Sequence, residues 1–256
     1  MRKLLIVLVI LAAPRLFAQA KSGDGETHFD TGLTHLREGR LELAVEEFKA
    51  AIKEDPKSPY FYKGLGIAYQ QIADKCPDAG CRQEPLKQAI AASRKALELN
   101  PYYTDARNDL GTALLRSGDR EAGKKELITA FGDPTNPSPE LTARNLGNAY
   151  LEDKNYTEAL SWYQSAVNRN KTYADAWIGL GDVLVAQGRL EEAIGQLERG
   201  SKELPKDMNV LQALGEVYYR AGRFGEARTR LETVASTDPT GPAGRRAADL
   251  LKNFPN

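Results

Sequence analysis

Glycine recurs along this chain of 256 residues at a nearly constant interval. The recurring positions are Gly32, Gly66, Gly111, Gly147, Gly181 and Gly215. Their spacings are 34, 45, 36, 34 and 34 residues, a register that chance would not hold. A second small residue follows twelve positions after most of them, at Ala44, Ala159, Ala193 and Ala227. Such a period indicates a solenoid, because one short unit cannot bury its apolar face without stacked neighbours.

The unit resembles the tetratricopeptide repeat, in which a large residue, Leu-Gly, Tyr, Ala, an aromatic, Ala and Pro hold fixed places in about 34 residues. The fifth unit shows the pattern well, with Trp177, Leu180, Gly181, Ala193 and Pro205. The resemblance implies an all-α fold, a right-handed superhelical solenoid of six helix-turn-helix repeats plus a C-terminal capping helix. The expected repeats are 25–58, 59–103, 104–139, 140–173, 174–207 and 208–241, and the expected cap is 242–256. We expect Gly39, Gly118, Gly188 and Gly222 to form the turns between paired helices.

The N-terminus has the pattern of an export signal. Arg2 and Lys3 precede the apolar run LLIVLVILAA (4–13), and the small-x-small sequence Ala18-Gln19-Ala20 follows. These features predict a signal peptide over 1–20, cleaved after Ala20. The apolar run is far shorter than the roughly 20 residues of a membrane span. Arg15 is atypical of a cleavage region, however, so an uncleaved anchor stays an alternative. The prediction places the protein in the periplasm.

Composition excludes several classes of function. The chain has 35 basic and 35 acidic residues, which argues against a nucleic-acid or membrane-surface binder that works by bulk charge. It has two cysteines and two histidines, and His28 and His35 occupy packing positions of the first repeat. No catalytic constellation is evident. We therefore expect a non-enzymatic protein with no metal, no cofactor and no small-molecule substrate.

The second repeat carries eleven extra residues around IADKCPDAGCRQEP (72–85). We expect the first helix to run on towards Lys75, and Pro85 to lie near the start of the second helix. In an exported protein the isolated pair Cys76 and Cys81 predicts a disulfide. A redox pair or half of a metal site is the alternative, but the spacing is unusual for redox motifs and further ligands are missing. The protruding tip is also a plausible partner contact.

Two extra residues and three prolines close the third repeat, at Pro134, Pro137 and Pro139. We expect the preceding helix to end near Phe131-Gly132, because Gly132 suits a helix C-terminus and the prolines prevent continuation. Ser138-Pro139-Glu140 then predicts a helix start, with a cap, a first-turn proline and an acidic residue at the positive helix end. A stiff, slightly longer junction explains this stretch without any ligand.

This stretch also resembles a narrower family, the type IV pilus biogenesis pilotins, which have six such repeats and help assemble the pilus secretin. Their third repeat ends approximately ALxDPxYPxPxxALENLG, and this chain has TAFGDPTNPSPELTARNLG (129–147) at the same place. Asn136 replaces the usual aromatic residue. The family is usually lipidated on a first mature cysteine, whereas Lys21 stands here and the first cysteine is Cys76. The resemblance implies assembly of a type IV pilus or secretin; the alternative is a generic periplasmic adaptor of the cell envelope.

The repeat register also predicts which side chains face the concave groove. They are Phe29, Leu33, Leu36, Lys63, Ile67, Asn108, Thr112, Arg144, Asn148, Ile178, Asp182, Gln212, Glu216 and Tyr219. The predicted surface is apolar at the N-terminal end, basic and amide-rich in the middle and acidic at the C-terminal end, which suits an amphipathic or extended peptide of a protein partner. A solvated surface without one ligand is the alternative. Arg144 and Asn148 match two positions of the carboxylate clamp of chaperone-binding relatives, but Gly179 and Ile67 break that pattern.

Overall fold

The computed structural model describes residues 23–254, which form thirteen α-helices and no strand. The helices are α1 (Gly23–Arg37), α2 (Leu41–Glu54), α3 (Pro59–Lys75), α4 (Ala79–Leu99), α5 (Thr104–Ser117), α6 (Arg120–Gly132), α7 (Pro139–Glu152), α8 (Tyr156–Arg169), α9 (Ala174–Ala186), α10 (Leu190–Glu203), α11 (Met208–Arg220), α12 (Phe224–Thr237) and α13 (Pro242–Lys252). This architecture confirms the predicted fold class. The predicted signal at 1–20 lies outside the described residues.

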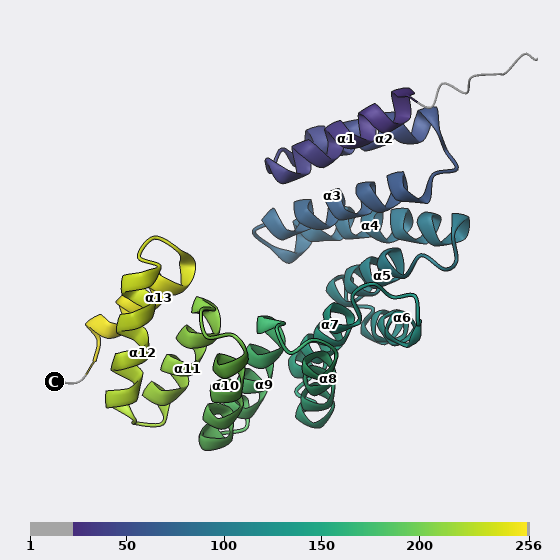
Figure 1. Ribbon diagram of the computed structural model, residues 1–256. Coiled ribbons are helices and arrows are strands. Elements are labelled where there is room, and N and C mark those ends of the chain that lie inside the picture. The colour runs from purple at the N-terminus through teal and green to yellow at the C-terminus, as the bar shows by residue number, and fades with distance from the viewer. Residues whose placement is uncertain (1–22, 255–256) are drawn as a thin grey trace, which may run out of the picture.

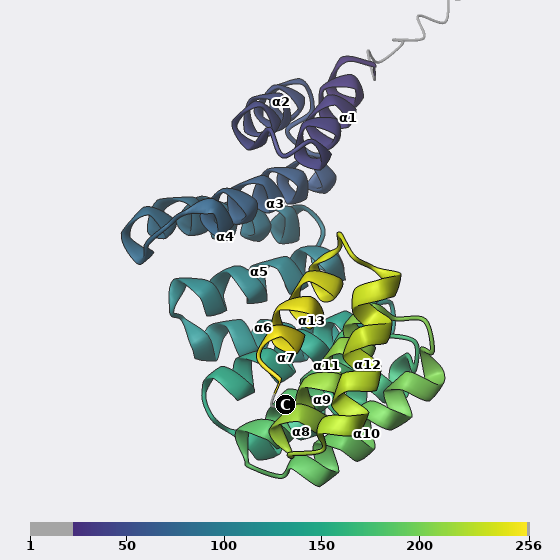
Figure 2. The same ribbon diagram turned by 90° about the vertical axis from the view of Figure 1, so that its left-hand side faces the viewer.

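The helices form antiparallel pairs that stack into a curved solenoid (Figure 1). The odd-numbered helices from α1 to α11 contact the next odd-numbered helix along the stack, whereas α2, α4, α6, α8, α10 and α12 contact only sequence neighbours. The odd-numbered helices therefore form the inner layer, and the even-numbered ones form the outer layer. The view turned by 90° shows the stack bending between α1–α4 and the C-terminal half (Figure 2).

Glycine makes the turns within four of the pairs, as expected. Gly39, Gly118, Gly188 and Gly222 have φ angles of 71°, 98°, 73° and 75°. Residues with a side chain seldom adopt this left-handed conformation, so glycine is favoured there. In the α7–α8 pair a lysine takes this place, because Lys154 has a φ angle of 58°. The tight turns hold the paired helices close enough to pack along their length.

The repeated glycines allow large rings to pack into the neighbouring helix. A Cβ atom at Gly32 would lie 2.7 Å from the Phe48 ring, and one at Gly147 would lie 2.9 Å from the Tyr163 ring. Trp177, Tyr163 and Phe48 are among the largest fully buried side chains. The core therefore runs along the solenoid between the two layers, as repeat stacking requires.

The extra residues of the second repeat lengthen both of its helices into a projecting hairpin. Helix α3 ends at Lys75, as expected, but α4 begins at Ala79, so the prediction that it begins near Pro85 is wrong. The Asp78 side chain accepts a hydrogen bond from the Cys81 N–H (2.9 Å) and so caps α4 at this earlier start. Pro85 consequently lies inside α4. The sulfur atoms of Cys76 and Cys81 are 2.10 Å apart, at bonding distance.

The junction with three prolines is organised by Asn136. Its amide donates to the Ala130 carbonyl (2.8 Å) and to Thr142 Oγ1 (3.1 Å), and its oxygen accepts from the Ser138 N–H (2.9 Å). These bonds join the end of α6 to the start of α7. Helix α6 ends at Gly132 and α7 begins at Pro139 after Ser138, as predicted, but the Ser138 side chain makes no capping hydrogen bond. The residue that departs from the pilotin motif thus holds the junction together.

Helix α13 covers the C-terminal end of the core. Ala247 is buried, and Leu250, Leu251 and Phe254 pack against the last cluster of the core. Arg245 and the other polar residues of this helix point to solvent, which gives the solenoid a polar end. No helix in the described range 23–254 is long and apolar enough to span a bilayer.

Candidate functional site

The residues predicted to line the groove all lie on the inner helices, but they differ in exposure. Most are half-buried, Asp182 is exposed, and Gln212 is only 5% exposed and so offers little surface. Phe29, Leu33 and Leu36 pack partly into the core cluster around Phe48. The apolar N-terminal end of the predicted groove therefore belongs in part to the core.

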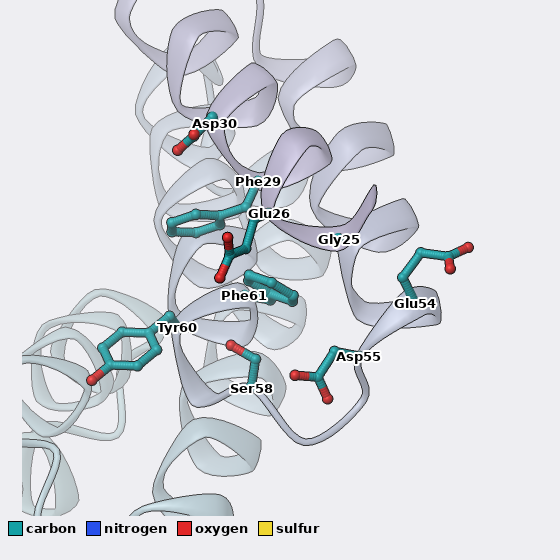
Figure 3. A pocket seen from close by; sticks show the side chains of 9 residues that line it. All are labelled: Gly25, Glu26, Phe29, Asp30, Glu54, Asp55, Ser58, Tyr60 and Phe61. Atoms are coloured by element: carbon teal, nitrogen blue, oxygen red, sulfur yellow. The ribbon is translucent and has the colours of Figure 1, made fainter. Parts of the chain in front are cut away.

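An open cavity of about 340 Å³ lies at the N-terminal end, between the start of α1 and the α2–α3 loop (Figure 3). Its lining is aromatic and acidic, and comprises Gly25, Glu26, Phe29, Asp30, Glu54, Asp55, Ser58, Tyr60 and Phe61. The rings of Phe29 and Phe61 are in contact, with centroids 5.2 Å apart. Only Phe29 of this set was among the predicted groove residues, because the prediction considered helix positions and omitted the loop between repeats.

Next along the groove, a lysine lies among carboxylates and tyrosines. Lys63 Nζ is 3.5 Å from Asp105 Oδ2 and 5.7 Å from the Tyr103 ring centroid. Asp109 lies beside them, and its buried Oδ2 has no hydrogen-bond partner. Burial raises the pKa of Asp109 to about 7, an effect that Lys63 partly offsets and Asp105 reinforces. This carboxyl can therefore change charge near neutral pH.

In the middle of the groove the polar side chains bind one another. The Arg144 guanidinium donates to Asp175 (2.8 Å) and to Asn145 (3.0 Å), and the Asn145 amide donates to Asn108 (3.2 Å). A second cavity of about 180 Å³ lies here. It is lined by Thr112, Leu115, Arg116, Arg144, Asn145, Asn148, Ala149 and Glu152. Burial alone would lower the pKa of Arg144, but the hydrogen bond to Asp175 and the charge interactions with Tyr173, Asp175 and Tyr163 together raise it.

The two side chains that match clamp positions are thus already engaged. Arg144 is paired with Asp175, and Asn148 accepts a hydrogen bond from the Tyr163 hydroxyl. At Gly179 a side chain would collide with the Tyr163 ring, since a Cβ would lie 2.2 Å from it. A carboxylate clamp is therefore incomplete here for steric as well as chemical reasons.

The C-terminal end of the groove is acidic. Although the Asp182 side chain is exposed, the surrounding inner wall partly desolvates it and so raises its pKa; Glu216 adds repulsion, and Arg220 opposes both effects. Tyr219 lies at the far end, and its ring contacts Phe254 with centroids 4.9 Å apart. Tyr219 therefore helps to seat the cap as well as to line the groove.

The histidines are occupied by local contacts. His28 Nδ1 lies 2.6 Å from Glu47 Oε2, and the buried Nδ1 of His35 has no hydrogen-bond partner. Nowhere in residues 23–254 do three His, Cys, Asp or Glu side chains converge as a metal site would require.

Several residues of this face were missed by the sequence prediction. Asp109 and Asn145 each follow a predicted residue directly, and Arg116 comes one turn after Thr112. The prediction took two positions from most inner helices, whereas neighbouring positions between adjacent inner helices also reach the groove. The polar residue types at those positions were the available signal.

Comparisons with known proteins place the chain among repeat proteins. Models described as tetratricopeptide repeats match residues 108–175, 150–214 and 211–233, and a model described as TPR repeat matches 32–72. The Protein CTR9 homolog of Arabidopsis thaliana is 23% identical over 81% of this chain, which spans 19% of that protein. The Type IV pilus assembly protein PilF of Pseudomonas aeruginosa is 24% identical over 62% of this chain and 59% of its own length. The chain spans 14% and 36% of the length of two further relatives, so it matches only part of such proteins.

Two solved structures share the architecture over nearly their whole length. The crystal structure of PilW, described as a widely conserved type IV pilus biogenesis factor, has a TM-score of 0.68 and 16% identity, covering 86% of this chain and 96% of its own. The Pseudomonas aeruginosa PilF structure has a TM-score of 0.64 and 17% identity, covering 89% and 97%. Identities this low show a common fold. The repeat matches and the stacked helix pairs together establish that the chain is a tetratricopeptide repeat protein.

Proposed function

We propose that this protein is a non-enzymatic periplasmic scaffold that helps to assemble a type IV pilus or its secretin. The observation that carries the proposal is the extent of the structural likeness. PilW and PilF match this chain over 96% and 97% of their own lengths, whereas the anaphase-promoting complex structure Cut9–Hcn1 matches over 42%. A solenoid of the same extent, with a proline-rich junction that resembles the pilotin motif, supports a role of the same kind.

Location outside the cytoplasm rests on two separate features. The N-terminal sequence predicts an export signal, and a disulfide between the neighbouring Cys76 and Cys81 would suit an oxidising compartment. We expect the purified exported protein to begin at Lys21. Mass spectrometry of the unreduced protein should show both thiols blocked; free thiols would contradict the oxidised pair.

The concave face is the proposed partner surface. Tetratricopeptide proteins bind protein or peptide partners, and the inner helices here present half-buried polar side chains beside two open cavities. Neither a nucleic acid nor a small-molecule substrate is proposed, because the chain has no excess of basic residues and no cluster of three His, Cys, Asp or Glu side chains fit for a metal among residues 23–254.

A deletion strain tests the role. We expect the strain to lose detergent-resistant secretin multimers and surface pili while secretin monomers remain, and a plasmid copy of the gene to restore both. Normal multimers and normal pili in the deletion strain would overturn the pilus role. That result would favour a generic envelope adaptor, which Lys21 in place of the usual lipidated cysteine also favours.

A further inference from the structure

The carboxylates of the N-terminal cavity differ from two others of the inner face that are paired with basic side chains. Elsewhere on the inner face, Asp105 is paired with Lys63 and Asp175 with Arg144. Four acidic residues line the cavity, Glu26, Asp30, Glu54 and Asp55, and none of them forms an ion pair within residues 23–254. Figure 3 shows the carboxylates of Glu26 and Asp55 directed towards the floor of the cavity and that of Glu54 directed away from it. Among residues 23–254, no lysine, arginine or histidine lines it. The cavity therefore concentrates negative charge that the fold itself does not neutralise.

Helix dipoles explain only part of this charge. Glu26 lies in the first turn of α1, at the positive end of that helix. A helix N-terminus contributes about half a positive charge. Glu54, in contrast, is the last residue of α2 and Asp55 is its C-cap, where the dipole disfavours a carboxylate. One helix end cannot balance these carboxylates, and the cavity keeps a net negative charge.

The floor of the cavity is aromatic. Figure 3 shows Glu26, Ser58 and Asp55 around the Phe61 ring, with Phe29 beside it and Tyr60 directed away. Gly25 allows α1 to approach this floor, because a Cβ there would lie 3.3 Å from both Phe61 and Glu54. Aromatic faces attract cations, and the guanidinium group of arginine also stacks on them.

The volume of the cavity and the separation of its carboxylates indicate which kind of cation fits. No three acidic side chains in residues 23–254 converge on one point, as a bare metal ion would need. A cavity of about 340 Å³ instead accommodates a whole side chain. A planar guanidinium has several donors directed to different sides, which suits separated carboxylates above an aromatic floor.

We propose that this cavity binds an arginine side chain of a partner polypeptide, which it anchors at the N-terminal end of the groove. This inference rests on the proposed scaffold function, since it names the side chain through which a partner is held. Charge complementarity and the aromatic floor identify the occupant.

The test is an NMR titration of the purified protein with N-acetyl-arginine amide. We expect shifts at the backbone amides of Gly25 and Phe61, and binding at least about tenfold weaker for the citrulline analogue, which has the same shape without the charge. The double variant Glu26→Gln/Asp55→Asn should lose the shifts. The double variant Asp182→Asn/Glu216→Gln makes the same change of charge at the other end of the groove and should keep them.

Equal shifts with the citrulline analogue, or none with the arginine amide, would overturn the proposal. Shifts that appear only after Lys21→Gln would also overturn it, because the chain's own N-terminal segment would then be the occupant. The secretin takes no part in this titration, so its failure would leave the assembly role intact. Conversely, a deletion strain with normal pili would leave the binding of arginine intact.

Discussion

The inner helices contact one another differently in the flanking repeats and in the middle repeats. In the second and fifth repeats the residue between adjacent inner helices is a glycine, Gly64 or Gly179, packed on the ring of Phe48 or Tyr163. The corresponding residues of the third and fourth repeats are Asp109, whose buried carboxyl lies in the field of Lys63 and Asp105, and Asn145, whose amide donates to Asn108. One repeat register therefore supports two kinds of interface.

The difference shows how a solenoid can keep its shape while its surface chemistry varies. A glycine against a ring depends on packing alone, which changes little with pH or salt. Buried or half-buried polar groups depend on ionisation and on their partners. The middle of the groove should therefore respond to pH, and the flanking interfaces should respond mainly to changes of volume.

The largest effect should come from filling a flanking interface. Gly179→Ala would place a Cβ 2.2 Å from the Tyr163 ring, and we expect it to lower the free energy of unfolding by about 3 kcal/mol. Gly195→Ala is the matched control, because nothing lies within 4 Å of a Cβ there. Thermal unfolding followed by circular dichroism compares them. Equal melting temperatures would show that the ring moves aside freely.

Removing the buried charge of the middle interface should raise the stability of the protein. The pKa of Asp109 is raised to about 7 in the folded protein, so its carboxyl destabilises the fold increasingly as pH rises from about 4 to about 7. We expect Asp109→Asn to stabilise the protein by about 2 kcal/mol at pH 8 and very little at pH 4. Asp30→Asn makes the same change at an exposed position and should not alter stability at either pH. Denaturant unfolding at both pH values measures this, and a gain that does not depend on pH would contradict it.

A smaller effect is expected where an arginine joins the second repeat to the third. The Arg116 guanidinium donates to the Gln70 carbonyl and to Asp74. Arg116→Ala should cost about 1 kcal/mol, less at high salt, because one partner is an exposed carboxylate. Lys53→Ala, at an exposed position on α2, is the control. A loss of stability that is the same at low and high salt would assign the effect to packing.

The smallest global effect should come from the cysteine pair, which lies outside both kinds of interface. Its hairpin tip is exposed, so Cys76→Ser/Cys81→Ser should change global stability by well under the roughly 2–4 kcal/mol typical of native disulfides. Hydrogen exchange should rise at 76–84 and stay unchanged in α9 and α11. A large drop in melting temperature would show that the tip supports the solenoid.

The fold could be predicted from the sequence because the same helix-pair pattern recurs along the chain. The glycine register set the helix pairs, and Gly39, Gly118, Gly188 and Gly222 marked the turns. The start of α4 was missed because Pro85 suggested a helix start more strongly than the Asp78 cap did. The acidic cavity was also missed, because Glu54 and Asp55 belong to a link between repeats whose path no periodicity describes. The pairing of Arg144 with Asp175 was likewise hidden, since it depends on side-chain reach between neighbouring repeats.

The most direct test of the account is hydrogen exchange of this protein alone and with the purified secretin of the same cell. The account predicts protection along the inner helices α1, α3, α5, α7, α9 and α11, beginning at the cavity around Phe61, with the outer helices unchanged. Protection confined to the outer helices or to the hairpin tip, or no protection at all, would contradict it.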